Sequence, residues 1–186
     1  MATSAECEAR IKKITDWKGL RSLWAAIRAG DTPGWDAGKA LEYLLIRAFE
    51  IDPDEPATVR YPYEVHLFGE KVEEIDGAIH LQGLSCLIES KDWGTNVTIA
   101  PIVKMRSQLL RRPAGTIGLV FAKEDFTTPA TYLAHFTLPQ AVLLWSGLDL
   151  QAAMDKGRIC KFLRLKLRVC CEGGIPDYSL IEANIP

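Results

Sequence analysis

The chain has 186 residues, of which 48% are hydrophobic, and its 22 lysines and arginines nearly balance 24 aspartates and glutamates. This length supports one well-cored domain and is short for two. A formal net charge of −2 argues against a protein that coats nucleic acid. No apolar run approaches the roughly 20 residues of a membrane span, and the N-terminus lacks the apolar segment of a secretory signal. We therefore expect a single cytoplasmic domain with no membrane partner and with reduced cysteines.

Charge is unevenly distributed along the chain. Residues 42–76 hold ten acidic and three basic residues, whereas residues 93–123 hold five basic residues and no acidic one. Residues 156–172 hold six basic residues and one acidic residue. This polarity is compatible with a polyanionic partner but does not require one.

Helices are predicted at the start of the chain. Residues 5–30 repeat apolar side chains near helical spacing and stop at Gly30. A second amphipathic helix is predicted over residues 38–51, and the sequence DPDEP ends it. We interpret residues 1–35 as a helical N-terminal extension and about 36–147 as the core of the single domain, which spans 1–186.

The pattern then changes to the period of two that is typical of strands. Three strand candidates follow one another through tight, glycine-containing turns, at 57–69, 71–81 and 84–93. Helices and short apolar strands alternate after them. The predicted helices are 96–112, 127–136 and 149–157, and the predicted strands are 115–122 and 140–147. The order predicts an α/β fold with a central mixed β-sheet flanked by helices.

The C-terminal segment, residues 148–186, is predicted to contain a short helix and a basic strand. In KFLRLKLRV, Arg164, Lys166 and Arg168 alternate with leucines. One face of such a strand would be buried and the other solvated. The basic face is either an ordinary solvated surface or a ridge that follows phosphates without selecting a base sequence.

The most informative stretch is EEIDGAIHLQGLSCLIESKDW, residues 73–93. With Gln82 and Gly83 as a two-residue hairpin turn, Asp76 lies opposite Glu89 and Glu74 lies opposite Lys91. Opposed residues share one face of a sheet, with Cβ atoms roughly 5 Å apart. The sequence therefore predicts a cluster of carboxylates with a lysine on one face.

Two carboxylates at that distance repel unless a cation lies between them or one of them is protonated. Grouped oxygen ligands with water in the remaining positions suit Mg²⁺. A neighbouring lysine can then orient a water or neutralise charge on a phosphoryl group. The simpler alternative is a surface ion pair between Lys91 and Glu74, worth roughly 0–1 kcal/mol.

One motif consists of Asp76, twelve intervening residues and Glu89-Ser90-Lys91, and it follows Glu42 on an amphipathic helix. This motif resembles that of the PD-(D/E)xK nuclease superfamily. The similarity is greatest to the Mrr-like restriction endonuclease group and covers about residues 36–147. GKALEYLLIRAF resembles the opening helix of that group, and GTIGLVFAKEDFTTPATYLA its later strand and helix. Ile75 stands where the proline that names the motif is expected. The resemblance implies a restriction endonuclease-like three-layer core.

By this resemblance, Asp76 and Glu89 are expected to ligate Mg²⁺, or Mn²⁺ as a substitute, together with the backbone carbonyl of Ser90. Lys91 is expected to position the attacking water.

Two further catalytic candidates follow from the same resemblance. Glu42 is expected to hold an outer-sphere water or a second metal ion, and its alternative role is that of an ordinary exposed helix glutamate. Gln108, on the helix after the Glu-x-Lys strand, is expected to support the site or face DNA.

The leading hypothesis is a Mg²⁺-dependent DNA endonuclease of restriction, defence or DNA-processing type. It would act as a homodimer, because cutting both strands needs two sites, and it could use a separate recognition subunit. The alternative is a nuclease-fold module that binds or assembles without cutting; a two-carboxylate glycoside hydrolase would leave Lys91 unexplained. The candidate DNA-binding residues are basic: Lys104, Arg111, Arg112, Arg164, Lys166 and Arg168.

Overall fold

The computed structural model describes residues 3–61 and 63–181. Within them, five strands form one mixed sheet in the order β1-β4-β5-β6-β7, and β2 and β3 form a separate two-stranded ribbon. The strands are β1 Thr58–Arg60, β2 Tyr63–Leu67, β3 Glu70–Ile75, β4 Gly77–Leu81, β5 Leu84–Lys91, β6 Thr116–Ala122 and β7 Val142–Trp145. The helices are α1 Ser4–Lys12, α2 Trp17–Ala29, α3 Lys39–Glu50, α4 Ile99–Leu109, α5 Thr128–His135, α6 Gly147–Lys156 and α7 Ile159–Gly173.

The sheet combines an antiparallel and a parallel part. Strands β1, β4 and β5 pair antiparallel, whereas β5, β6 and β7 pair parallel. The parallel connections run through α4 and α5, as strands of equal direction require. The predicted α/β fold with a central mixed sheet is confirmed.

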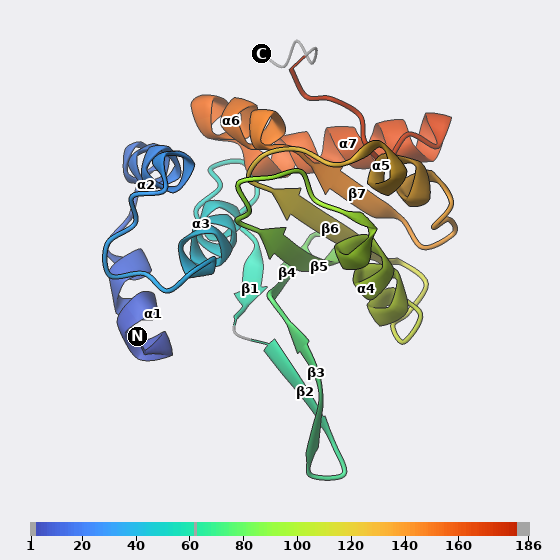
Figure 1. The fold of residues 1–186 in the computed structure, drawn as a ribbon, viewed down its shortest axis with the longest axis horizontal. Helices are drawn as coiled ribbons and strands as arrows, with labels where there is room; N and C mark the ends of the chain where they lie inside the picture. The colour runs from blue at the N-terminus through green and yellow to red at the C-terminus, as the bar shows by residue number, and fades with distance from the viewer. Residues whose placement is uncertain (1–2, 62, 182–186) are drawn as a thin grey trace.

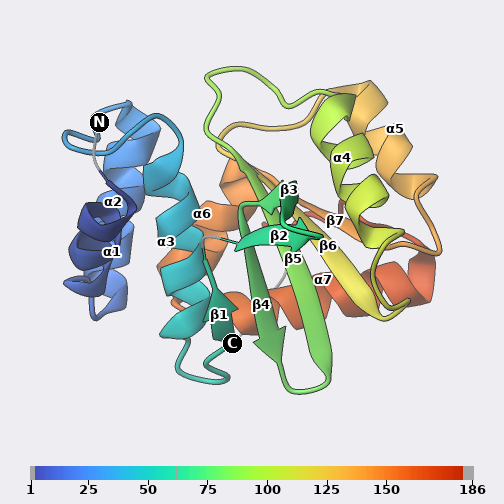
Figure 2. The same cartoon turned by 90° about the horizontal axis from the view of Figure 1, so that it is seen from below.

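Helices cover both faces of the sheet, which gives three layers (Figures 1 and 2). Strand β6 explains why both faces are covered, because it carries apolar side chains on each. Leu119 and Phe121 face one side, and Val120 and Ala122 face the other. The first side packs against α2, α3, α6 and α7, and the second packs against α4 and α5. A strand that is apolar on both faces must be covered on both.

The helix ends follow local signals in the sequence. Gly30 adopts a left-handed conformation, with φ 70°, directly after α2. Thr127 accepts a hydrogen bond from the Ala130 amide at the start of α5, and Ser146 and Asp149 form a capping box at the start of α6. Helices α1 and α2 fall within the predicted N-terminal extension.

The three-strand meander is wrong in one respect, because its first two strands are each divided. The first gives β1 and β2, and the second gives β3 and β4, with Asp76 at the division. The β1–β4 pairs and the Tyr63–Ile75 pair keep one common register, so they belong to one long hairpin whose outer half leaves the sheet. That outer half, the β2–β3 ribbon, projects from the body in Figure 1.

The predicted basic strand at the C-terminus is also wrong, because these residues lie in helix α7. Phe162, Leu163, Lys166 and Cys170 are buried at helical spacing. Residues 182–186 of the predicted C-terminal segment lie outside the described residues. No helix in the described part of the chain has the length and apolar character needed to cross a membrane.

Candidate functional site

The site lies where the long hairpin leaves the sheet. The predicted register of β4 and β5 is observed, with Leu81 opposite Leu84 and Gly77 opposite Ile88. Asp76 immediately precedes Gly77, and Glu89 immediately follows Ile88, so the two carboxylates come together at the end of the pairing. Glu74 and Lys91, in contrast, are not paired, because β3 has turned away to pair with β2.

Asp76 is anchored by the neighbouring strand. Its Oδ2 accepts a hydrogen bond of 2.8 Å from the Ser90 amide and a longer one of 3.4 Å from the Ser90 hydroxyl. Burial raises the pKa of Asp76 to about 6, and the negative charge of Glu89 acts in the same direction. A buried carboxyl beside a second carboxylate is the arrangement that a bound cation would relieve.

Glu89 is buried, with its residue 1% exposed, and each of its oxygens contacts an ammonium group. Oε1 accepts from Lys91 at 2.5 Å and Oε2 from Lys104, on α4, at 2.6 Å. Lys91 also donates to the carbonyl oxygen of Ser90 at 3.0 Å. The two lysines therefore neutralise a carboxylate that burial alone would make costly.

Glu42 lies in the first turn of α3, where the helix dipole favours a negative charge. Its Oε2 accepts from Lys39 at 2.7 Å and from the Tyr61 hydroxyl at 2.7 Å. Burial, followed by the hydrogen bond to Glu42, raises the pKa of Tyr61 above its ordinary range. The negative charge of Glu42 also contributes to the raised pKa of Asp76, so Glu42 acts electrostatically on the carboxylate pair.

Lys39 and Tyr61 were missed by the sequence analysis. The proline at position 62 offered a signal for Tyr61, because proline has no N–H to donate and rarely lies within a paired strand. A break in the first strand candidate was therefore predictable. Tyr61, directly before the proline, was a candidate for a residue outside the regular strand pairing.

Gln108 supports the site from α4 and does not face solvent, because it is 2% exposed. Its Nε2 donates to the backbone carbonyl of Glu74 at 3.3 Å, two residues before Asp76. Its Oε1 is buried without a hydrogen-bond partner. Of the two roles expected for Gln108, the observed position fits support of the strand and excludes direct contact with DNA in this conformation.

The predicted DNA-binding residues do not form one surface. Arg111 and Arg112 both pair with Glu73, so they hold the base of the β2–β3 ribbon against the end of α4. Arg164 pairs with Glu55 and donates to the carbonyl of Gln82 at 3.0 Å. Gln82 lies in the turn before β5, roughly 20 Å from the far end of that strand, since a strand rises about 3.3 Å per residue.

The assignment of Lys166 to a DNA-binding face is wrong. On a helix, Lys166 does not share a face with the exposed Arg164 and Arg168, and it is 0% exposed. Its ammonium contacts Asp149 at 2.9 Å and the backbone carbonyls of Leu144 and Tyr178. This buried group is neutralised within the protein and has no access to a phosphate.

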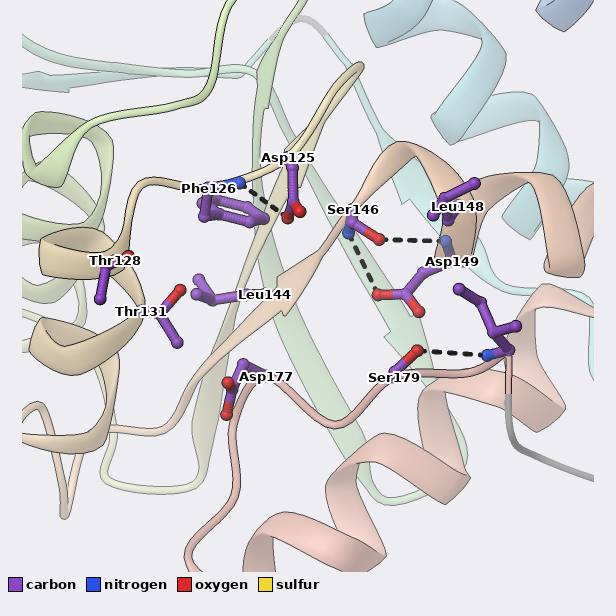
Figure 3. Close-up of a pocket in the computed structure, with 11 residues that line it drawn as sticks. Asp125, Phe126, Thr128, Thr131, Leu144, Ser146, Leu148, Asp149, Asp177 and Ser179 are labelled. Carbon is purple, nitrogen blue, oxygen red and sulfur yellow. Dashed lines mark hydrogen bonds between the residues drawn. The ribbon is translucent and has the colours of Figure 1, made fainter.

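A cavity of about 360 Å³ lies away from the carboxylate pair, at the carboxyl end of β7 (Figure 3). Its most buried carboxylate, Asp149, is already engaged, because it accepts hydrogen bonds from the amides of Ser146 and Leu180 and pairs with Lys166. Asp149 therefore attaches the segment that follows α7 to the start of α6. None of the residues that line it belongs to the predicted site.

The chemistry of the donor set fits one Mg²⁺. Within residues 3–61 and 63–181 there is no cluster of three or more histidine, cysteine, aspartate and glutamate side chains suited to a metal ion. Mg²⁺ does not need one, because it commonly binds through one or two carboxylates and keeps several waters. Asp76 and Glu89 supply two carboxylates, and the carbonyl of Ser90 supplies a third oxygen. The ammonium groups on Glu89 already occupy positions that attract positive charge.

Comparison with known proteins adds no assignment. No model of a known protein family matches the chain, and no curated protein or solved structure matches it either. The resemblance to PD-(D/E)xK nucleases therefore remains a prediction from the residues quoted above.

Proposed function

We propose that the protein is a Mg²⁺-dependent DNA endonuclease whose centre is Asp76, Glu89 and Lys91. One observation carries the proposal: a raised-pKa carboxyl and a buried carboxylate meet at the end of β5, and a lysine contacts both Glu89 and the carbonyl of Ser90. Strongly perturbed carboxyl groups next to a specific charged partner are typical of functional sites.

The proposed reaction is hydrolysis of a phosphodiester. The oxygen of one water forms a bond to phosphorus, one phosphorus–oxygen ester bond breaks, and the alcohol leaves with a proton. A Mg²⁺ ion bound by the carboxylates supplies charge neutralisation and a more acidic water. In this proposal Lys91 orients the attacking water, and the contacts of its ammonium group with Glu89 and with the carbonyl of Ser90 support that role.

Glu42 has a supporting role in this proposal. Lys39 and Tyr61 both hold the same oxygen of Glu42, which leaves the other oxygen available for a water near Asp76. Tyr61 and Lys39 are positioning residues, since they act through Glu42.

Of the basic residues predicted to bind DNA, Lys104 is the one that reaches the site. Its side chain is 44% exposed and contacts Glu89. Each lysine or arginine contact with a phosphate adds about one unit to the slope of log affinity against log salt. Lys104 should therefore contribute about one unit to the salt dependence of DNA binding, and binding should be tighter in Ca²⁺ than in chelator because the bound ion offsets the acidic site.

A homodimer is part of the proposal, because cleavage of both strands needs two centres. Exposed apolar side chains on α4 and α5 and at their C-terminal ends support it, among them Val103, Leu110, Tyr132 and Phe136. A shallow groove of about 130 Å³ separates the two helices there. Contiguous exposed apolar surface is typical of protein–protein contact, and sedimentation should show a dimer that the charge-introducing change Val103→Glu dissociates.

The decisive assay is cleavage of supercoiled and linear DNA in Mg²⁺ or Mn²⁺. We expect Asp76→Asn and Glu89→Gln to lower the rate by at least about 100-fold, equivalent to about 2.7 kcal/mol of activation free energy. Glu172→Gln is the matched control, because Glu172 is exposed near the end of α7, and it should cut at the wild-type rate. Salt-dependent DNA binding without cleavage by the wild type would favour the non-cutting module instead. If the wild type neither binds nor cuts DNA, both the endonuclease proposal and the non-cutting DNA-binding alternative are refuted.

A further inference from the structure

The two lysines on Glu89 differ in how firmly they are held. Lys91 lies on the same strand as Glu89, is 22% exposed in its side chain and has a second acceptor in the carbonyl of Ser90. Lys104 comes from α4 and is 44% exposed in its side chain. In the described part of the chain, Lys104 has no second hydrogen-bond acceptor. Lys104 is therefore the less firmly held of the two lysines, and its departure from the buried Glu89 costs free energy unless another cation replaces it.

Both oxygens of Glu89, one of the two carboxylates that would hold a divalent cation, are occupied by ammonium groups. The ammonium group of Lys104 is 2.6 Å from Oε2 of Glu89, while Lys91 holds Oε1. A cation shared by Asp76 and Glu89 must take one of these oxygens, and it repels both ammonium groups. Because Lys104 is the less firmly held of the two lysines, we expect the cation to displace it rather than Lys91.

An anion that accepts the displaced ammonium group would offset this cost. A phosphodiester placed at the carboxylate pair carries such a negative charge, and Lys104 is exposed enough to turn toward it. Two ligands that each relieve the same ion pair bind cooperatively, and the coupling is reciprocal.

We propose that Lys104 is an internal counter-ion that keeps the affinity of the site for divalent cations low until a phosphate of the nucleic acid substrate takes its ammonium group. This inference rests on the proposed metal site. It goes beyond the proposed activity, because it makes loading of the cation depend on bound substrate. A free protein of this kind would hold little metal and would not cut without its substrate in place.

The first test is Mn²⁺ binding to the protein without nucleic acid, followed by electron paramagnetic resonance of the free ion. Lys104→Gln should bind Mn²⁺ at least about tenfold more tightly than the wild type, a difference of about 1.4 kcal/mol. Lys104→Arg keeps the counter-ion and should stay within about threefold of the wild type. Arg106→Gln removes the same charge from an exposed position on the same helix and should have an effect of less than about twofold.

The second test measures the coupling to substrate. The affinity for a fluorescent DNA duplex is measured in Ca²⁺ and in chelator, and the ratio of the two affinities gives the coupling. This ratio should be at least about fivefold larger in the wild type than in Lys104→Gln. If the glutamine variant is unstable, Lys104→Met, which keeps the aliphatic stem, replaces it in both tests.

The outcomes separate this inference from the proposed function. Equal Mn²⁺ affinities in the wild type and Lys104→Gln would overturn the counter-ion role. Tighter binding by Lys104→Gln, with a wild type that cuts no DNA, would support the counter-ion role and overturn the nuclease proposal. Absence of Mn²⁺ binding to either protein would overturn both.

Discussion

Replacing Asp76 with asparagine should stabilise the metal-free protein at neutral pH. Burial raises the pKa of Asp76 from 3.8 to about 6 in the folded protein, so the folded state binds this proton more tightly than the unfolded state. That contribution to stability is fully present below the unfolded pKa and is lost as the pH rises through about 6. The loss is about 3 kcal/mol, at 1.36 kcal/mol for each pKa unit.

Asparagine removes the titration and keeps the shape, and its amide oxygen can still accept the hydrogen bond from the Ser90 amide. In chelator, the unfolding free energy of Asp76→Asn should exceed that of the wild type by about 0.5 kcal/mol near pH 4 and by about 3 kcal/mol near pH 7. Urea unfolding at a series of pH values measures this difference. Asp31→Asn, at an exposed position after α2, should change stability by less than about 0.5 kcal/mol.

Adding Mg²⁺ should shrink the difference, because a ligand that binds only the folded wild type stabilises it by mass action. Lower stability of Asp76→Asn than of the wild type, in chelator at neutral pH, would refute this prediction. Asp76 would then be a carboxylate that the fold needs, and its proximity to Glu89 would say nothing of a cation.

Two further predictions concern the surroundings of the site. Lys166→Met should lower the unfolding free energy by about 3–5 kcal/mol, because it leaves Asp149 buried without its cation; chemical denaturation measures this, and a loss below about 1 kcal/mol would contradict it. Glu73→Gln should release the β2–β3 ribbon from Arg111 and Arg112. Amide hydrogen exchange should then accelerate in the ribbon and not in β5 or β6. Unchanged protection of the ribbon would show that other contacts hold it.

Local signals in the sequence were sufficient for most of the fold and for the register at the site. The Gln82–Gly83 turn fixes which residues of β4 and β5 are opposed. Gly83 has a positive φ of 71°, which a type II turn requires at its second central residue. The position of Asp76 beside Glu89 follows from that register. The pairing of Glu74 with Lys91 failed because it assumed that β3 continued in the sheet beyond Asp76.

Tertiary contacts account for what the sequence did not predict. Lys104 was expected on a DNA-binding surface, yet from α4 it contacts Glu89, fifteen residues earlier in the chain. No periodicity encodes such a contact. The alternation in KFLRLKLRV mimicked a strand, although α7 runs from Ile159 to Gly173. In α7, Lys166 takes a core position because Asp149 and two backbone carbonyls satisfy its charge. The alternation of charged and apolar residues had predicted a solvent-exposed Lys166.

Anomalous diffraction from crystals soaked in Mn²⁺ tests the central claim most directly, because it locates the ion without reference to activity. At a concentration high enough to displace Lys104, the account predicts one peak within coordination distance of Asp76, Glu89 and the carbonyl of Ser90, with the Lys104 ammonium group moved away from Glu89. A well-diffracting crystal with no peak at these oxygens, and with both lysines still on Glu89, would contradict it.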